Sequence, residues 1–330
     1  MKRNVKLLGT GAYLPERIVT ASEMDRLINA KEGWSEKKSG VKQRHFVSGQ
    51  ETASYMGAEA AKEALKEAGI TLGEIDCIIG ASGTMEQPIP CNASLIQEAL
   101  GKEAGGIPCF DINATCLSFV TALDTISYLL HAGRYQRVLL VSSEIASVGI
   151  NFEQNESSIL FGDGAVAAVF SRTEESSHII ASHMRTYSDG AHFAEIAGGG
   201  TKLHAKHYQE ENKNPYLFHM DGTSIFKLSS RKLPSFMNEL FEGTEMDLSD
   251  VDLLIPHQAS ASAMKIIRRK LGVKQELFMN IIENYGNMIS ASIPLGLHLA
   301  IQQGRLKRGN KVLLLGTSAG LSIGGVLFEY

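Results

Sequence analysis

The chain carries an internal repeat, and this feature limits the folds open to it more than any other. The stretch "EALKEAGITLGEIDCIIGAS" resembles "NELFEGTEMDLSDVDLLIPHQAS": each has a helix end, an acidic turn and an apolar strand opened by Asp76 or Asp252. In a second pair, "TCLSFVTALDTISYLLHAGRYQRVLLVSS" resembles "GNMISASIPLGLHLAIQQGRLKRGNKVLLLGTS", with a long apolar helix, a Gly-Arg turn and a strand. Such self-similarity predicts two copies of one structural unit that pack on each other.

Within each copy, strand-like and helical segments alternate. Runs such as "RVLLVSS" and "KVLLLGTS" are typical of strands buried on both faces, and residues 52–70 have Ala and Leu on one helix face and Lys and Glu on the other. The alternation predicts an α/β protein with an N-terminal half at 1–172 and a C-terminal half at 173–330. Residues 173–220 are polar and rich in histidine, so we expect them to connect the halves and cover a pocket.

Composition excludes several classes of function. A net charge of −4 gives no support for nucleic-acid binding, and four cysteines in 330 residues are too few for a disulfide framework. No signal peptide and no membrane span is expected, which favours a cytoplasmic protein. His204 and His207 have a spacing that metal sites can use, but their polar surroundings favour a solvated loop, so no metal is expected.

The repeat also predicts a site. Aligning the second pair of segments on Gly133 and Gly304 places Cys116 and Asn287 at matching points, each at the start of its central helix. His257 ends a strand in the second half. If the halves pack with pseudo-twofold symmetry, the two helix N-termini face one another, and a thiol, an imidazole and a carboxamide meet.

These residue types suit carbonyl chemistry. The positive end of a helix favours the thiolate form of Cys116, which is the nucleophilic form. Neutral His257 and the amide of Asn287 can each donate a hydrogen bond to an oxygen that becomes an enolate. Taken singly, a packed cysteine, a capping histidine and an N-cap asparagine are common; Cys77 and Cys109, which lie in strand-like runs, are expected to be such core residues.

The motifs "GTGAYLPERIVT", "SGVKQRH", "NATCLSF", "LFGDGAVAAVF", "PHQAS" and "NYGNMISASIPLGLHLA" resemble, in order, those of beta-ketoacyl-acyl-carrier-protein synthase III enzymes of the thiolase superfamily. The resemblance implies a duplicated thiolase fold in five layers, αβαβα, with two mixed five-stranded sheets and buried central helices. It also implies a homodimer, usual in this family.

The resemblance implies a reaction as well. Cys116 would take an acyl group from acyl-CoA, and a malonyl thioester on acyl carrier protein would then lose carbon dioxide. His257 and Asn287 would stabilise the enolate, whose carbon attacks the acyl group on Cys116. The backbone N–H groups of Cys116 and Ala319 would form the oxyanion hole. No cofactor is implied, since acyl-CoA is a substrate.

The same resemblance suggests roles for residues that recognise the substrates. Trp34 matches a tryptophan that stacks on adenine, and Lys38 stands where the family has a nucleotide-binding arginine. Ile89 and Thr317 would shape the acyl tunnel. Lys265, Arg268 and Arg269 would form a basic face that docks the carrier protein.

Departures from the family pattern question a role in starting ordinary fatty acids. Lys38 lacks the bidentate fork of arginine, and two other family arginines are replaced near Asn155 and at Ser262. A specialised acyl pathway is therefore a second possibility beside fatty-acid initiation.

Three other functions share features with this sequence. The fold can support acyl transfer to another acceptor or condensation without decarboxylation, with Glu86 as a base. A papain-like cysteine hydrolase has Cys, His and Asn in the same order but needs no duplication. An inactive partner of another synthase has no need of an intact Cys, His and Asn set.

Overall fold

Nine strands form two large mixed sheets in the computed structural model, which describes residues 1–175 and 177–330. The first sheet contains β1 (Val5–Tyr13), β4 (Cys77–Gly80), β5 (Cys109–Asp111), β6 (Arg137–Glu144) and β7 (Gly164–Arg172), and the second contains β8 (Ile179–Thr186), β11 (Leu253–Pro256), β12 (Lys311–Ser318) and β13 (Ser322–Glu329). Their orders are β1-β7-β6-β4-β5 and β8-β13-β12-β11. In the first sheet, β1 and β6 each pair antiparallel with β7, and β4 pairs parallel with both β6 and β5. In the second sheet, β8 and β12 each pair antiparallel with β13, and β11 pairs parallel with β12.

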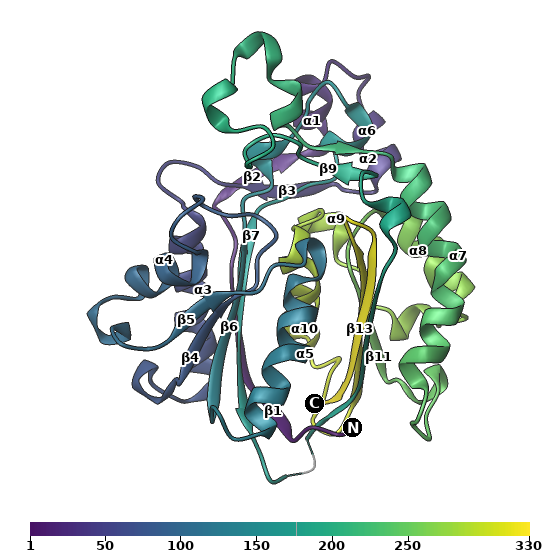
Figure 1. Cartoon of the computed structure of the whole chain (residues 1–330). Coiled ribbons are helices and arrows are strands. Elements are labelled where there is room, and N and C mark those ends of the chain that lie inside the picture. Colours follow the sequence, from purple (N-terminus) through teal and green to yellow (C-terminus); the bar gives the residue numbers. More distant parts are fainter. Residues whose placement is uncertain (176) are drawn as a thin grey trace.

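Helices lie between the sheets and on both outer faces, which gives five layers (Figure 1). The outer face of the first sheet carries α3 (Ala53–Ala68) and α4 (Asn92–Leu100), and the outer face of the second carries α7 (Gly222–Phe241) and α8 (Ala261–Lys270). The central layer contains α5 (Ser118–His131) and α10 (Ser292–Gln302). The predicted layer order is thus present. No helix among the described residues is long and apolar enough to cross a bilayer.

The second half differs from two expectations. The segment 173–220 is not only a connection, because Ile179–Thr186 forms β8, an edge strand of the second sheet. The second sheet has four strands rather than five, since Phe278 makes only a single bridge to Leu254 beside β11. Beyond this bridge, the side-chain amide of Gln258 makes the hydrogen bonds that a longer pair of strands would make. It donates to the Met279 carbonyl at 3.3 Å and accepts the Ile281 N–H at 2.9 Å.

Smaller elements gather at the end of the sheets opposite the two chain termini (Figure 1). They are β2 (Arg17–Thr20), β3 (Gln43–Phe46), β9 (Ala194–Glu195), β10 (His219–Met220), α1 (Ala21–Leu27), α2 (Trp34–Ser39), α6 (Asn155–Ser158) and α9 (Ile282–Tyr285). The apolar bursts of the sequence thus build the sheets, and the polar segments form a cover over one end.

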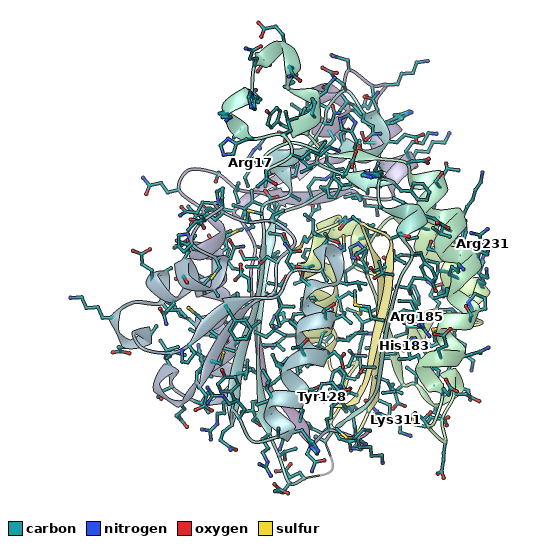
Figure 2. All side chains as sticks on the ribbon, viewed as in Figure 1. Arg17, Tyr128, His183, Arg185, Arg231 and Lys311 are labelled. Atoms are coloured by element: carbon teal, nitrogen blue, oxygen red, sulfur yellow. The ribbon has the colours of Figure 1, made fainter. Side chains whose placement is uncertain are left out.

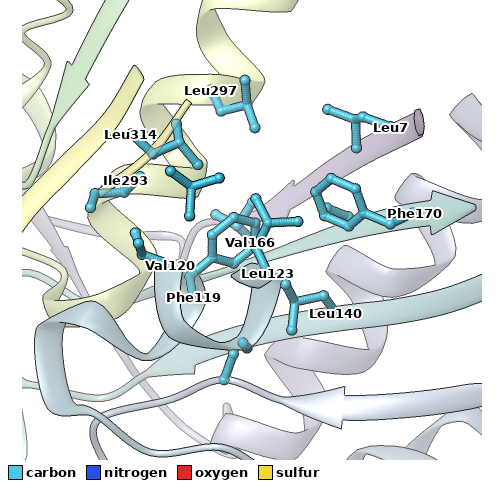
Figure 3. Packing of buried hydrophobic residues seen from close by; sticks show 14 of the residues in the cluster. Leu7, Phe119, Val120, Leu123, Leu140, Val166, Phe170, Ile293, Leu297 and Leu314 are labelled. Atoms are coloured by element: carbon cyan, nitrogen blue, oxygen red, sulfur yellow. The ribbon is translucent and has the colours of Figure 1, made fainter. Parts of the chain in front are cut away.

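The two central helices pack into one apolar core between the sheets (Figure 3). The helices contribute Phe119, Leu123, Ile293 and Leu297 to this core, and the two sheets contribute Leu140, Val166, Phe170 and Leu314. Side chains fill the space between the helices and the sheets along their whole length (Figure 2). Because interiors are packed this closely, the start of each helix is held at a fixed place relative to the other.

Candidate active site

Cys116 lies in a tight turn, η3 (Thr115–Leu117), that leads directly into α5. Thr115 has a φ of 51°, which is rare for a β-branched residue. Two side chains hold this turn: Asn113 Oδ1 accepts the Thr115 N–H and Ser118 Oγ accepts the Ala114 N–H, both at 2.9 Å. Side chains that precede and follow Cys116 in the chain therefore hold the backbone of its turn in place.

Asn287 precedes a turn of the same construction, η11 (Ile289–Ala291), which leads into α10. Ile289 has a φ of 47°. Asn287 Oδ1 accepts the Ile289 N–H, and Ser292 Oγ accepts the Met288 N–H, both at 2.9 Å. Since a backbone N–H can only donate, this contact fixes which way the Asn287 amide points and leaves its Nδ2 to donate elsewhere.

These two turns correct the alignment made on Gly133 and Gly304. By position in the turn, the counterpart of Asn287 is Asn113, and the counterpart of Cys116 is Ser290. The cause is a difference in helix length: α5 has 14 residues and α10 has 11. The caps at the start of each helix mark equivalent places, whereas the glycines at the ends do not.

The two turns pack against one glycine. A Cβ placed on Gly83 would lie 2.8 Å from Ile289 Cγ2 and 3.2 Å from the carbonyl carbon of Thr115. Gly83 follows β4 and touches both positive-φ residues, so the Cys116 and Asn287 turns lie side by side. No larger residue fits at position 83 without moving one of them.

His257 follows β11 directly and is 6% exposed. A Cβ placed on Gly316 would lie 2.9 Å from His257 Cβ and 3.1 Å from Leu117 Cδ2, so one glycine separates the histidine from the cysteine turn. Burial lowers the pKa of His257 to about 4, so the ring is neutral at physiological pH. Its Nδ1 has no hydrogen-bond partner in the described part of the chain.

Cys116 is partly buried, and part of the residue remains accessible to solvent. Burial raises the pKa of the thiol to about 12, a negative charge on Glu144 would add to this effect, and the N–H groups of Ala319 and of Cys116 itself oppose it. The N–H groups at the helix start lower this pKa as expected, but dehydration of the sulfur outweighs them, so the net shift is upward. Ala319, between β12 and β13, nevertheless directs its N–H at the sulfur.

The residues suggested for nucleotide binding lie on α2. Lys38 is exposed, and its Nζ stands 6.0 Å from the centre of the half-buried Trp34 ring. The end of α2 abuts the start of α8, since a Cβ placed on Gly40 would lie 2.5 Å from Ala261 Cβ. This pair is therefore next to the helix that carries the suggested docking face.

The suggested docking residues of α8 differ in their surroundings. Lys265 and Arg269 are exposed, whereas Arg268 is partly buried and donates to the Val273 carbonyl at 3.0 Å. Arg231, on neighbouring α7, points outward on the same side of the molecule (Figure 2).

The two residues suggested for the acyl tunnel differ in how exposed they are. Thr317 is half-buried on β12, next to Gly316. Ile89 is 84% exposed on the loop before α4. In the single chain, then, solvent and not a tunnel surrounds the Ile89 side chain.

Two further ideas from the sequence do not fit the site. Glu86 is exposed and accepts the Ser54 N–H at 2.7 Å, so it caps the first turn of α3. His204 also caps a turn, with Nδ1 accepting the Lys206 N–H at 3.1 Å. Among residues 1–175 and 177–330, no group of three or more His, Cys, Asp and Glu side chains is arranged to hold a metal ion.

Sequence reasoning missed Glu144, the fully buried carboxyl at the end of β6, close enough to Cys116 that its protonation state affects the thiol. The available signal was a carboxylate that ends an otherwise apolar strand, at the edge of the sheet from which active-site side chains usually leave.

Comparison with known proteins identifies the family. Residues 110–188 match the family described as 3-Oxoacyl-[acyl-carrier-protein (ACP)] synthase III, and residues 241–330 match its C-terminal region. A Beta-ketoacyl-[acyl-carrier-protein] synthase III from Aquifex aeolicus is 35% identical over 326 residues, which cover 98% of this chain and 99% of that protein. The chain belongs to the 3-oxoacyl-[acyl-carrier-protein] synthase III family.

Solved structures of this synthase III family agree with the fold. The Aquifex aeolicus crystal structure matches with a TM-score of 0.89 at 33% identity and covers 99% of this chain and 100% of that one. The priming beta-ketosynthase of the R1128 polyketide pathway matches with a TM-score of 0.89 at 26% identity and covers 99% of this chain and 97% of that one. The chain is a condensing enzyme of the synthase III type, and relatives of this type work in more than one pathway.

Proposed function

We propose that this enzyme joins an acyl group from acyl-CoA to a malonyl thioester on acyl carrier protein. In the first stage, His257 receives the proton of the Cys116 thiol, and the sulfur attacks the acyl carbonyl carbon. The bond to the CoA sulfur breaks, and CoA leaves with the proton. The N–H groups of Cys116 and Ala319 stabilise the negative oxygen in this step.

In the second stage, the malonyl thioester loses its carboxylate as carbon dioxide, and the electrons of the broken bond form an enolate. Neutral His257 and the Nδ2 of Asn287 donate hydrogen bonds to the enolate oxygen. The enolate carbon then attacks the acyl carbon on Cys116, and the Cys116 sulfur leaves as the thiolate and takes a proton from solvent water. Covalent capture thus divides one difficult bond formation into two easier steps.

One observation carries this proposal: the two mirrored turns lie side by side at Gly83, and a buried neutral histidine lies one glycine away from the cysteine turn. A neutral ring can donate to an enolate oxygen without first losing a proton, and the fixed Asn287 amide leaves its donor free. Both features suit stabilisation of an enolate better than peptide hydrolysis, which needs the asparagine beside the histidine.

Recognition of the two substrates is proposed to involve α2 and the neighbouring helix α8. The Trp34 ring would stack on adenine while Lys38 contacts a phosphate, and Lys265, Arg268 and Arg269 would attract the acidic carrier protein to the neighbouring helix. Because Lys38 and Asn155 replace residues expected to be arginine, the starter acyl-CoA is proposed to be held by fewer charged contacts. The pathway is fatty-acid initiation or a specialised acyl pathway.

A homodimer is part of the proposal. β5 is one of the two edge strands of the first sheet, and exposed Phe110 lies on it. Unpaired edges invite pairing with another chain. A second copy docked along this edge would cover Ile89 and bring it into the acyl tunnel, together with Thr317. Sedimentation analysis would then show a dimer.

The test is mass spectrometry of the intact protein after incubation with a panel of acyl-CoAs. We expect one acyl group on the wild type and on Cys91→Ala, and none on Cys116→Ala. Malonyl carrier protein should then yield carbon dioxide and a 3-oxoacyl product. Acylation of Cys116→Ala, or a product that retains the malonyl carboxylate, would contradict the proposal.

A further inference from the structure

Glu144 is a buried acid that the reaction proposed above does not use. It ends β6 and is fully buried. Among the described residues, Glu144 takes part in no ion pair. A carboxyl group in such a position needs a structural or chemical reason, because burying an unpaired charge is costly.

The contacts of Glu144 join the two halves of the site. Its Oε1 accepts the Gly83 N–H at 2.6 Å, and its Oε2 accepts the N–H and the hydroxyl of Thr84 at 2.9 and 2.6 Å. Oε1 also contacts Ser290 Oγ and lies 3.4 Å from the Ser290 N–H nitrogen. One carboxyl group therefore links the glycine between the two turns to Ser290, which holds in the second turn the place that Cys116 holds in the first.

The number of hydroxyl hydrogens around Ser290 indicates whether the carboxyl group of Glu144 is protonated. Ser290 Oγ lies 2.8 Å from the Ala81 carbonyl oxygen, 2.5 Å from Ser142 Oγ and in contact with Glu144 Oε1. The carbonyl oxygen can only accept, and Ser290 has one hydroxyl hydrogen to give. If that hydrogen goes to Ala81, the contact with Glu144 has a hydrogen only when the carboxyl group carries one. A neutral Glu144, with Ser142 also donating, satisfies all three contacts.

Electrostatics favours the same form. Burial raises the pKa of Glu144. The titratable group coupled to it is the Cys116 thiol, while the loop after β4, strand β6 and η11 contribute hydroxyl and backbone groups. A negative charge at this place would oppose both a thiolate at Cys116 and an enolate between His257 and Asn287. The neutral acid keeps the contacts without that charge.

We propose that Glu144 is a positioning residue that ties the Cys116 turn to the Asn287 turn and does so as the neutral acid. The inference rests on the proposed function only in taking Cys116 as the nucleophile. Glutamine is the nearest replacement, since its NH₂ group replaces the acid hydroxyl as donor to Ser290 and its oxygen still accepts from Thr84, while only the Gly83 N–H loses its acceptor.

The test compares wild type, Glu144→Gln and Glu144→Ala by the rate at which iodoacetamide alkylates Cys116. Between about pH 6 and about pH 8 we expect Glu144→Gln to stay within about twofold of wild type. Glu144→Ala should lose about tenfold or more in acylation by acyl-CoA, and Glu144→Gln should restore it. Alkylation of Glu144→Gln more than about tenfold faster than wild type would show that a negative charge had been removed, and would overturn the proposal.

Infrared spectroscopy gives a second measurement that does not depend on turnover or on the folding of Glu144→Ala. The wild type should show the carbonyl stretch of a protonated carboxyl group that is absent from Glu144→Gln, and a wild type without this band would overturn the proposal. Failure of the proposed condensation would give a different set of results. A protein that shows the band and the matched alkylation rates but forms no 3-oxoacyl product would contradict the condensation and not the role of Glu144.

Discussion

Asn113 and Asn287 hold equivalent positions in two mirrored turns, and the side-chain oxygen of each accepts the N–H of the residue two positions further on, at 2.9 Å. Their surroundings differ, because Asn113 is exposed and Asn287 is 7% exposed. The duplication thus supplied two copies of one turn, and the buried copy lies where its amide can act on a substrate.

This pair offers a matched test of the Asn287 amide. Asn287→Asp keeps the oxygen that accepts the Ile289 N–H but replaces the donor by a negative charge. We expect condensation to fall by about a hundredfold or more, as when one oxyanion-hole donor is lost. Acylation of Cys116 should change little, since it does not need this donor. Asn113→Asp is the control and should condense at a rate near that of wild type; an equal loss in both variants would show that only the turn was disturbed.

Gly83→Ala tests whether the contact between the two turns matters. The added methyl group would press on Ile289 and on the backbone of Thr115. Overpacking of this kind costs about 1–3 kcal/mol of unfolding free energy, and we expect the rate of Cys116 acylation to fall with it. Gly73→Ala, where the nearest atom is 4.0 Å away, is the control for urea unfolding and acylation. Unchanged acylation in Gly83→Ala would show that the turns tolerate displacement.

The repeat explains why so much of the fold was predictable. Continuous apolar runs identified the buried strands, and the helix over 52–70 has the periodicity and the Thr52 cap that the structure shows. The duplication also indicated that two helix starts meet. The register between the copies was wrong because it was taken from glycines at the helix ends, and three residues can be lost from a helix end while its capped start stays in place.

Electrostatic properties were less predictable than positions. A sequence shows that Cys116 precedes a helix, but the net shift of its pKa also depends on groups from distant segments, such as the backbone N–H of Ala319 and the carboxyl group of Glu144. The partners of Glu144 include residues 60 and 146 positions away in the chain. No local pattern records such contacts, so the sign of the Cys116 pKa shift could not be read from the sequence.

The raised pKa of Cys116 predicts how the free enzyme reacts with iodoacetamide. With a pKa of about 12, the thiolate is a small fraction at neutral pH. That fraction, and hence the alkylation rate, should rise about tenfold for each pH unit from about pH 6 to about pH 9. Mass spectrometry of digested protein would follow Cys116 separately from Cys91 and Cys109. A plateau below about pH 8 would instead indicate a thiolate–imidazolium pair, which a neutral His257 excludes.

The lowered pKa of His257 predicts a loss of stability in acid. Between the ordinary value of 6.5 and about 4, the unfolded chain binds a proton that the folded chain does not. The free energy of unfolding contributed by this group is therefore complete above about pH 6.5 and decreases by about 3 kcal/mol as pH falls to about 4. In His257→Gln this part of the decrease should vanish, whereas the exposed control His207→Gln should follow wild type in urea unfolding at each pH. Parallel curves for wild type and His257→Gln would contradict a buried neutral ring.

The basic face of α8 can be tested by charge reversal. Lys265 and Arg269 are exposed, so a double change to glutamate should leave the fold intact while repelling an acidic carrier protein. We expect KM for malonyl carrier protein to rise about tenfold at low salt, and the difference to shrink as salt screens the charges. Acylation by free acyl-CoA should stay close to wild type, because the carrier protein takes no part in that step. Lys62→Glu combined with Lys66→Glu, on α3 at the opposite outer face, provides a control with the same change in net charge. If both double variants raised KM equally, net charge and not the α8 surface would govern the encounter.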